Sequence, residues 1–281
     1  MKILSGLLLA DKINKETAEE VKRRNLKLCL NVIYAGQNQA SKKYIAKKAD
    51  LASELGIDFK LWNISESSDP SEIIELINRL NRDKKSTGII VQLPLPEKYE
   101  TDFILEKIAP NKDVDGLCSV NLGKLIKNNS GLFPATPEGI IRLLRHYKIE
   151  ISGKNVVIVG RSNLVGKPLA QMFVNEDATV TIANGKTKSL SDVTRKADIL
   201  VSATGKPGII KENMVKRGSV VIDVGTSFVN GKITGDVDFD EVSRKAGFIT
   251  PVPGGVGPMT VAVLLSNLIK AHQLQGERVD G

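Results

Sequence analysis

The chain has 281 residues, of which 41% are hydrophobic and 26% charged, and its formal net charge is +8. This length suits two domains better than one compact core, and the composition is that of a globular protein. No apolar run is long enough to span a bilayer, so we expect no membrane association. The apolar run at residues 3–10 is too short for a signal peptide, and we therefore expect a cytoplasmic protein.

The positive charge is compatible with two classes of partner, nucleic acids and small anionic metabolites. Aromatic residues make up only 4% of the chain, whereas nucleic-acid binding usually adds exposed aromatic residues or a basic stripe. We therefore expect no nucleic-acid partner. The two cysteines, Cys29 and Cys118, form no CxxC motif, so no metal site is expected. The chain has two histidines, His146 and His272, and each lies in a helical pattern. We therefore expect Lys, Asp, Glu or Tyr to carry any acid–base chemistry.

The first half of the chain alternates predicted strands and helices. In chain order these are a strand at 28–34, a helix at 40–55, a strand at 57–62, a helix at 69–82 and a strand at 87–96 that ends in prolines. Gly56 marks the end of the first helix, and Pro70 suits the first turn of the second. This βαβαβ order implies a parallel sheet covered by helices.

The second half repeats the alternation. Its predicted elements are a helix at 136–147, a strand at 153–160, a turn and helix at 161–174, strands at 178–183, 198–203 and 219–225, and a long helix at 257–273. The sequence therefore predicts two α/β units. Substrate is expected between them, at the carboxyl ends of the strands.

The segment VVIVGRSNLVGKP predicts a dinucleotide site. Its strand ends at Gly160, and a helix begins near Gly166, so the backbone can approach a pyrophosphate at a helix N-terminus. The pattern is GxSxxxG rather than GxGxxG, and glycine also marks ordinary strand–helix turns. The three strands that follow complete a dinucleotide-binding half and favour the functional interpretation.

The next strand end indicates which dinucleotide binds. An NAD site usually places a carboxylate there, to hold the ribose hydroxyls, but this strand runs into Asn184-Gly185-Lys186-Thr187-Lys188. Arg161, Lys186 and Lys188 are candidates to bind a 2′-phosphate. The sequence thus favours NADP over NAD, with exposed loop cations as the alternative interpretation.

Candidate chemical groups lie in the first half. Tyr44 and Lys48 are spaced i, i+4 on one helix face, and Ser41 is one turn earlier. Lys47 also lies within one turn of Tyr44, so the spacing does not choose between the lysines. Gln92 ends a buried strand, where an amide is well placed to face a cleft.

A second candidate group is the DVDG loop, which carries Asp113 and Asp115. Taken singly, each of these candidates also has an ordinary structural explanation: a lysine on a helix face, an edge glutamine or a loop aspartate.

Six motifs in order make the set recognisable: Tyr44 with Lys48, GIIVQLPLP, NKDVDGL, PATPEG, VGRSNLVGKP and TPVPGGVGPMT. Over nearly its whole length the chain resembles the bifunctional methylenetetrahydrofolate dehydrogenase/methenyltetrahydrofolate cyclohydrolase family. The resemblance implies an α/β fold with a βαβ catalytic, folate-binding domain at 1–134 and 256–281. It also implies a Rossmann-like NADP-binding domain at 135–255, with the C-terminal helix returning to the catalytic domain.

The resemblance also implies a multifunctional enzyme of one-carbon metabolism, both oxidoreductase and hydrolase. Such enzymes oxidise 5,10-methylenetetrahydrofolate with NADP and hydrolyse the methenyl product to 10-formyltetrahydrofolate, which links them to purine biosynthesis. Homodimers are usual. A dehydrogenase without the hydrolase, and NAD in place of NADP, remain alternatives, as do a hydroxy-acid dehydrogenase and a basic nucleic-acid-binding protein.

Site residues carried over by motif fall into three groups. Those implied for catalysis are Lys48, Tyr44, Gln92 and Asp115. Those implied for substrate binding are the same four with Leu93, Pro253, Gly254, Gly257 and Val261. Those implied for cofactor binding are Gly160, Arg161, Ser162, Val165, Gly166, Asn184, Gly185, Lys186, Ala203, Thr204, Gly205, Thr226, Gly257 and Thr260.

Several positions depart from the family pattern, namely Asp50, Leu117-Cys118, Ala135, Asn184-Gly185 and Thr226-Ser227. Asn184-Gly185 replaces a His-Ser pair whose serine would help to bind the 2′-phosphate, so Arg161 and Lys186 are expected to compensate. Asp50 replaces a lysine and is expected to alter the charge near the folate site. Because Tyr44, Lys48, Gln92 and Asp115 are present, we expect both activities.

Overall fold

The computed structural model describes residues 1–229 and 231–276, with the side chains of residues 39 and 40 left out. The chain divides into two compact units, and the division falls within two long helices, α1 (Leu7–Arg23) and α10 (Val256–Gly276). One unit comprises Met1–Asp11 and Pro134–Thr260, here the nucleotide unit; the other comprises Lys12–Phe133 and the chain from Val261, here the lysine unit. None of the described helices is both long and apolar enough to cross a membrane.

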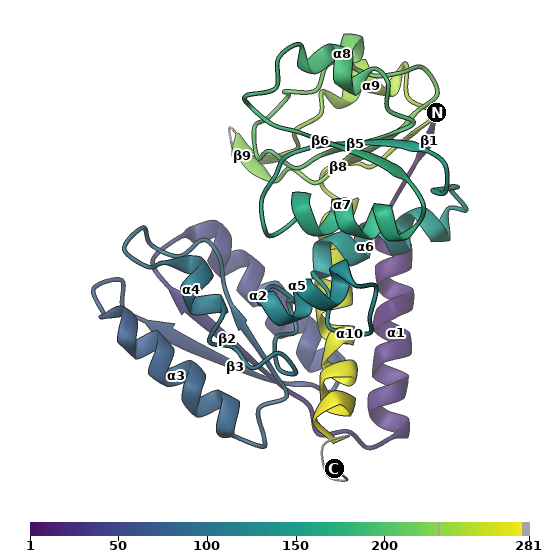
Figure 1. Cartoon of the computed structure of the whole chain (residues 1–281). Helices are drawn as coiled ribbons and strands as arrows, with labels where there is room; N and C mark the ends of the chain where they lie inside the picture. Colours follow the sequence, from purple (N-terminus) through teal and green to yellow (C-terminus); the bar gives the residue numbers. More distant parts are fainter. Residues whose placement is uncertain (230, 277–281) are drawn as a thin grey trace. The chain divides into compact units, whose positions relative to one another are not determined.

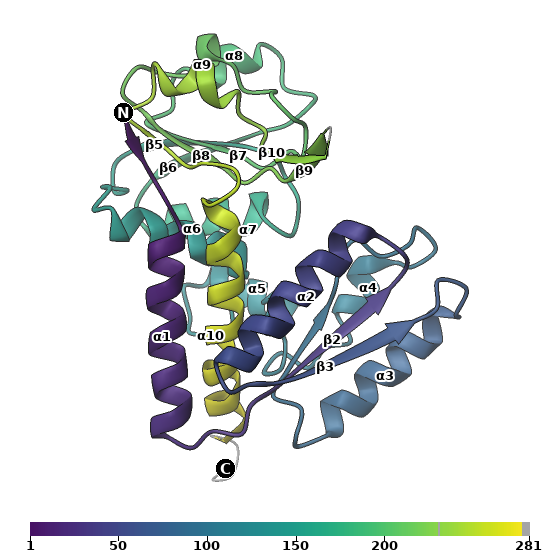
Figure 2. The ribbon, with the colours of Figure 1, turned by 180° about the vertical axis from the view of Figure 1, so that it is seen from behind.

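The lysine unit is built on a three-stranded parallel sheet in the order β3-β2-β4. Besides its parts of α1 and α10, its elements are β2 (Cys29–Ala35), α2 (Gln39–Glu54), β3 (Asp58–Ile64), α3 (Pro70–Arg82), β4 (Gly88–Val91), α4 (Thr101–Leu105) and α5 (Ser119–Ile126). Figure 2 shows α2 and α3 on opposite faces of this sheet. All seven residues of β2 are buried, as expected for a central strand covered on both faces.

The sheet order places a topological switch point in this unit. The chain passes from β2 to β3 on one side and then returns to form β4 on the other. At such a switch point the following loops separate, and ligands of α/β proteins bind outside the carboxyl ends of the strands there. The segments that follow β2 and β4 contain Lys48 and Gln92.

The nucleotide unit is built on a six-stranded parallel sheet in the order β1-β11-β8-β7-β5-β6, with a separate antiparallel pair, β9 and β10. Its remaining elements are β1 (Lys2–Ile3), α6 (Ala135–His146), β5 (Asn155–Val159), α7 (Gly166–Asn175), β6 (Thr179–Ala183), α8 (Leu190–Thr194), β7 (Ile199–Ser202), η1 (Glu212–Met214), β8 (Val220–Asp223), β9 (Ser227–Val229), β10 (Lys232–Thr234), α9 (Phe239–Ser243) and β11 (Phe248–Ile249). Figure 1 shows α7 on one face of the six-stranded sheet and α8 and α9 on the other. Here the switch point lies between β5 and β7.

These observations confirm the predicted fold class of two α/β units with parallel sheets and a C-terminal helix that joins the first-half unit. Most of the predicted long helices and buried strands are present within two residues of their expected bounds. The strand expected at 87–96 ends earlier, at Val91, and the helix expected at 257–273 continues to Gly276. The two-residue strand β1 and its partner β11 were not predicted.

Close packing at Gly88 yields a stability prediction. A Cβ on Gly88 would lie 2.5 Å from Leu268 Cδ2 and 2.7 Å from Val114 Cγ1, and both side chains are fully buried. We expect Gly88→Ala to lower the free energy of unfolding by about 1–3 kcal/mol, because overpacking a dense core forces its neighbours to move. Denaturant titration with fluorescence and circular dichroism measures the change.

The matched control is Gly123→Ala on α5, where the added Cβ meets nothing within 4 Å. Alanine is the better helix former there, so this variant is expected to keep or raise the midpoint. Equal denaturation midpoints for the two variants would show that the side chains around Gly88 can move to accept a methyl group without loss of stability.

Candidate functional site

Helix α2 carries a buried lysine, Lys48, whose amine contacts Gln92, the residue after β4. The Asn38 side chain caps the helix by accepting a hydrogen bond from Ser41 N at 3.0 Å. Tyr44 and Lys48 then follow one turn apart. Lys48 is 9% exposed whereas Lys47 is exposed to solvent, so burial selects between the two lysines that the sequence left open.

Gln92 holds the amine of Lys48. Lys48 Nζ donates to Gln92 Oε1 at 2.9 Å, and Gln92 Nε2 donates to Leu93 O at 2.9 Å. The second bond fixes the amide with its oxygen toward the lysine. Gln92 N also donates to Ile33 O at 2.8 Å, which continues the β4–β2 ladder and fixes the backbone beneath the pair. The amide orients the amine without adding a charge.

Burial and the carboxylate of Asp115 shift the pKa of Lys48 in opposite directions. Desolvation lowers the pKa of Lys48, because a buried ammonium loses its hydration, and the charge of Asp115 partly offsets this. Burial likewise raises the pKa of Asp115 to about 6, against the opposing effect of Lys48. At neutral pH Asp115 is therefore mostly ionised, and Lys48 loses its proton more readily than an exposed lysine does.

Two aspartates in one loop have different roles. Asp113 is buried, and its Oδ2 accepts from Cys118 N at 2.8 Å and from Asn121 Nδ2 at 3.1 Å, so it shapes the loop. Asp115 is partly exposed, and among the described residues no hydrogen bond to its carboxylate is recorded. Its oxygens are thus available to a ligand.

Buried donors anchor the loop that carries Asp115. Asn267 Nδ2 on α10 donates to Val114 O at 2.9 Å, and Ile89 N on β4 donates to Lys112 O at 2.8 Å. Lys112 is itself buried, and its Nζ donates to Leu80 O and Asp83 O at 2.9 and 2.7 Å. These hydrogen bonds could not be predicted from the sequence, because their partners are distant along the chain.

The predicted cofactor residues gather at the carboxyl edge of the six-stranded sheet. Gly160, Asn184, Ala203 and Thr226 follow the neighbouring strands β5, β6, β7 and β8 within three residues of their ends. The structure thus brings together four loops that are separate in sequence, at the switch point where dinucleotides bind in such sheets.

At two positions of this sheet edge the close packing leaves no room for a side chain, so only glycine fits. Gly160 has φ +135°, and a Cβ there would lie 2.4 Å from Ala203 O. A Cβ on Gly166 would lie 2.2 Å from Gly160 O, so the N-terminus of α7 packs directly on the turn. Ser162 Oγ accepts from Val165 N at 3.1 Å and Gly166 N at 3.5 Å. A backbone cradle of this kind fits a pyrophosphate.

The turn after β6 contains cations and no carboxylate. Asn184 Oδ1 accepts from Lys186 N at 2.9 Å, and Asn184 N donates to Thr187 Oγ1 at 2.9 Å, which closes the turn. Arg161 and Lys186 are exposed, and within the described part of the chain neither forms a recorded ion pair. Because Val159 and Ala183 are paired in the sheet, their following loops lie side by side. This arrangement fits a 2′-phosphate.

The remaining predicted residues lie around the start of α10. Gly254 O accepts from Gly6 N at 2.9 Å, and a Cβ on Gly6 would lie 2.0 Å from Gly255 O. Thr260 Oγ1 lies 2.9 Å from Thr136 Oγ1. Pro253 is exposed, and a side chain at Gly257 would meet nothing within 4 Å. Val261 is the first α10 residue in the lysine unit.

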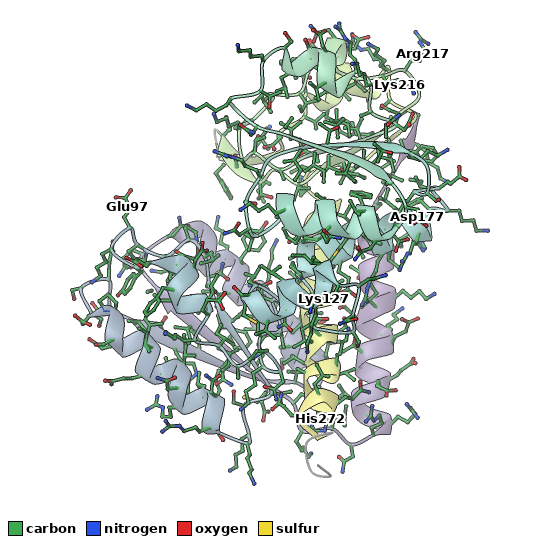
Figure 3. All side chains as sticks on the ribbon, in the orientation of Figure 1. Glu97, Lys127, Asp177, Lys216, Arg217 and His272 are labelled. Carbon is green, nitrogen blue, oxygen red and sulfur yellow. The ribbon has the colours of Figure 1, made fainter. Side chains whose placement is uncertain are left out.

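A cavity of about 400 Å³ in the nucleotide unit is separate from these loops. Its lining includes Ile199 and Val220, the first residues of β7 and β8, so it lies at the amino edge of the sheet. Lys216 and Arg217 also line it, and Figure 3 shows both at the periphery of this unit. The cavity is therefore not the predicted cofactor site.

Comparison with known proteins matches both units. Residues 4–115 match the catalytic-domain model of the tetrahydrofolate dehydrogenase/cyclohydrolase family, and residues 134–276 match its NAD(P)-binding-domain model. A bifunctional protein FolD from Lactobacillus helveticus is 47% identical over 99% of each chain.

Solved structures of such proteins superpose over the full chain. The bifunctional enzyme FolD of Campylobacter jejuni has a TM-score of 0.95 and 45% identity, covering 98% of this chain and 99% of that one. The Trypanosoma brucei methylenetetrahydrofolate dehydrogenase-cyclohydrolase, solved with NADP and an inhibitor, has a TM-score of 0.92 and 36% identity, covering 99% and 98%.

The electrostatic link between Asp115 and Lys48 can be measured. Asp115→Asn removes the negative charge that raises the lysine pKa but keeps the burial that lowers it. We expect the pKa of Lys48 to fall further in this variant, as followed by NMR titration of the lysine side chains. Glu54→Gln, at an exposed position in the last turn of the same helix, is the control and should leave it unchanged. A Lys48 pKa that stays constant in Asp115→Asn would show that the charge of Asp115 does not reach the amine.

Proposed function

The chain belongs to the tetrahydrofolate dehydrogenase/cyclohydrolase family, and on this premise we propose that it oxidises 5,10-methylenetetrahydrofolate with NADP and hydrolyses the methenyl product to 10-formyltetrahydrofolate. The observation that supports both steps in one site is the buried Lys48 amine, held by Gln92 at 2.9 Å, with Asp115 close enough to act on its pKa. Oxidation requires orientation of the folate, and hydrolysis requires a base.

The proposed hydrolysis uses Lys48 in its neutral form. The amine donates one N–H to Gln92, which leaves its lone pair free to take a proton from water as the water oxygen bonds to the cationic methenyl carbon. The ammonium then returns that proton to N5 as the bond between N5 and the carbon breaks. The hydroxyl on the carbon loses its own proton to water in the same step, which leaves the formyl group on N10. Burial favours this role, because a lysine with a lowered pKa has more of the neutral amine at neutral pH.

In the proposed oxidation the chain mainly orients the reactants. Lone pairs of the two nitrogens flanking the methylene carbon stabilise the cation that forms, so no base is required. NADP supplies the hydride acceptor when bound. Asp115 offers two acceptor oxygens for adjacent pterin N–H groups, with its loop fixed by Asp113. Tyr44 is proposed to lie over the folate.

The nucleotide unit fits NADP. Gly160 and Gly166 leave room that a Cβ would fill, and the N-terminus of α7 follows the turn. Arg161 and Lys186 supply positive charge beside β6 in place of the missing serine. Around the switch point, the predicted contacts from Ala203, Thr204, Gly205 and Thr226 come from the loops after β7 and β8. The start of α10, with Gly257 and Thr260, is proposed to complete the cofactor and folate contacts.

The wider assignments are proposals that rest on the family resemblance. We propose that residues 1–134 and 256–281 act on folate and residues 135–255 bind NADP; residues 277–281 lie outside the described part of the chain. We also propose a cytoplasmic homodimer whose 10-formyltetrahydrofolate serves purine biosynthesis. The net charge of +8 suits a phosphorylated cofactor and a glutamate-tailed folate.

A pair of neighbouring lysines tests the hydrolytic step. Lys48→Met should lower the hydrolysis rate of methenyltetrahydrofolate by about 10²- to 10⁴-fold, the usual effect of losing a general base, while NADP still binds. Lys47→Met removes the same charge from an exposed position and should hydrolyse at the wild-type rate. The decay of methenyltetrahydrofolate absorbance measures both rates. Full hydrolytic activity in Lys48→Met would show that a group other than Lys48 is the base.

A pair of arginines tests the choice of cofactor. Arg161→Ala should lower kcat/KM for NADP by about 10- to 150-fold, since a hydrogen bond to a charged group contributes about 1.5–3 kcal/mol, and should change NAD use far less. Arg217→Ala, at the amino edge of the same sheet, is the matched control. Initial rates of cofactor reduction with each dinucleotide give the ratio, and an equal loss with both would exclude Arg161 from phosphate recognition.

A further inference from the structure

A fully buried carboxylate lies beneath the proposed cofactor loops. Asp236 is 0% exposed and lies between β10 and α9. Its Oδ2 accepts three hydrogen bonds, from Ser202 Oγ at 2.9 Å, Thr204 N at 2.6 Å and Thr204 Oγ1 at 2.9 Å. Its other oxygen is buried too and has no hydrogen-bond partner among the described residues. A buried charge carries a large desolvation penalty, so this one calls for an explanation.

Asp236 fixes the loop after β7. Thr204 is held by both its backbone and its hydroxyl, and the same hydroxyl oxygen accepts from Lys206 N at 3.1 Å. The carbonyl oxygen of Ala203, one residue earlier, lies so close to Gly160 that a Cβ there would be only 2.4 Å from it. The position of this loop therefore also determines the room beside the Gly160 turn.

Asp236 also packs under the loop after β8. A Cβ on Gly225 would lie 2.2 Å from Asp236 Oδ1, so the loop passes directly over the carboxylate. Ser227 Oγ donates to Gly205 O at 3.1 Å and joins the two loops. These loops carry the predicted cofactor contacts Ala203, Thr204, Gly205 and Thr226.

The backbone of Asp236 is itself fixed by the end of β8. Asp223 Oδ1 accepts from Asp236 N and Gly225 N, both at 2.9 Å, and Asp223 Oδ2 accepts from Val237 N at 2.9 Å. Ile210 N donates to Asp236 O at 3.1 Å. The carboxylate thus has a fixed base from which to hold the loops.

We infer that Asp236 is a positioning residue for the dehydrogenase step: its carboxylate holds the loops at 203–206 and 225–227 in the shape that accepts NADP, without contacting the cofactor. The inference rests on the proposed function. Oδ2 holds the loop at 203–206 by hydrogen bonds to Thr204, and Oδ1 packs against Gly225 in the other loop.

Two substitutions at this position separate hydrogen bonding from charge. Asp236→Asn keeps one oxygen for the three donors and can place its amide nitrogen at the position of the oxygen that has no partner. Asp236→Ala removes all three acceptor contacts. We expect Asp236→Ala to raise KM and Kd for NADP by about tenfold or more with a smaller change in kcat, and Asp236→Asn to remain near the wild type.

Hydrolysis of methenyltetrahydrofolate without cofactor is the internal control and should be unchanged in both variants. Asp240→Ala, at an exposed position on α9, is the matched surface control. NADP binding by calorimetry and separate assays of the two activities give the readouts. Normal NADP affinity in Asp236→Ala would overturn the inference, as would equal impairment of Asp236→Asn or a parallel loss of both activities.

A second variant covers the case in which Asp236→Ala does not fold. Ser202→Ala removes one hydrogen bond to the same oxygen from a fully buried position. It should raise KM for NADP in the same direction, with hydrolysis unchanged, and an unaltered KM would overturn the inference. A wild-type protein that does not reduce NADP with methylenetetrahydrofolate would instead overturn the proposed function on which the inference depends.

Discussion

The proposed hydrolysis depends on an amine that is removed from water but given a neutral partner. Desolvation lowers the pKa of Lys48, and Gln92 fixes the amine without supplying the negative charge that would restore that pKa. A carboxylate in place of Gln92 would form a buried ion pair and keep the lysine protonated. In the proposed mechanism the neutral amide preserves a base, and the β4–β2 ladder holds Gln92 in place for it.

The negative charge of the site is kept at a distance from the amine instead. Asp115 influences Lys48, but the two form no recorded ion pair within the described residues. The two aspartates of the loop differ in their partners. Asp113 Oδ2 accepts hydrogen bonds from Cys118 and Asn121 and so shapes the turn, whereas the oxygens of Asp115 are left for a ligand. A pKa of about 6 keeps Asp115 mostly ionised at neutral pH, as an acceptor of two N–H groups must be.

Periodicity was sufficient to predict most of the long helices and buried strands, because their apolar residues recur at a regular spacing. It did not choose between Lys47 and Lys48, since both lie within one turn of Tyr44 and only burial distinguishes them. Strands β1 and β11 have two residues each, too few for any pattern. Asp236 was missed for a further reason: its partners Ser202 and Thr204 are more than 30 residues earlier, and no local pattern marks the contact.

Buried charge in the nucleotide unit follows a different logic from that around Lys48. Replacing buried ionic groups by well-packed apolar ones is often neutral or stabilising, so stability alone does not account for two buried aspartates at one sheet edge. Asp223 organises backbone amides from three residues, and burial raises its pKa to about 6, with the charge of Asp236 adding to the effect. Asp236 then holds a loop that has no regular structure to fix it. At this edge parallel strands have ended, and their loops no longer share a hydrogen-bond ladder. A buried acceptor supplies the order that the sheet cannot extend to the loops.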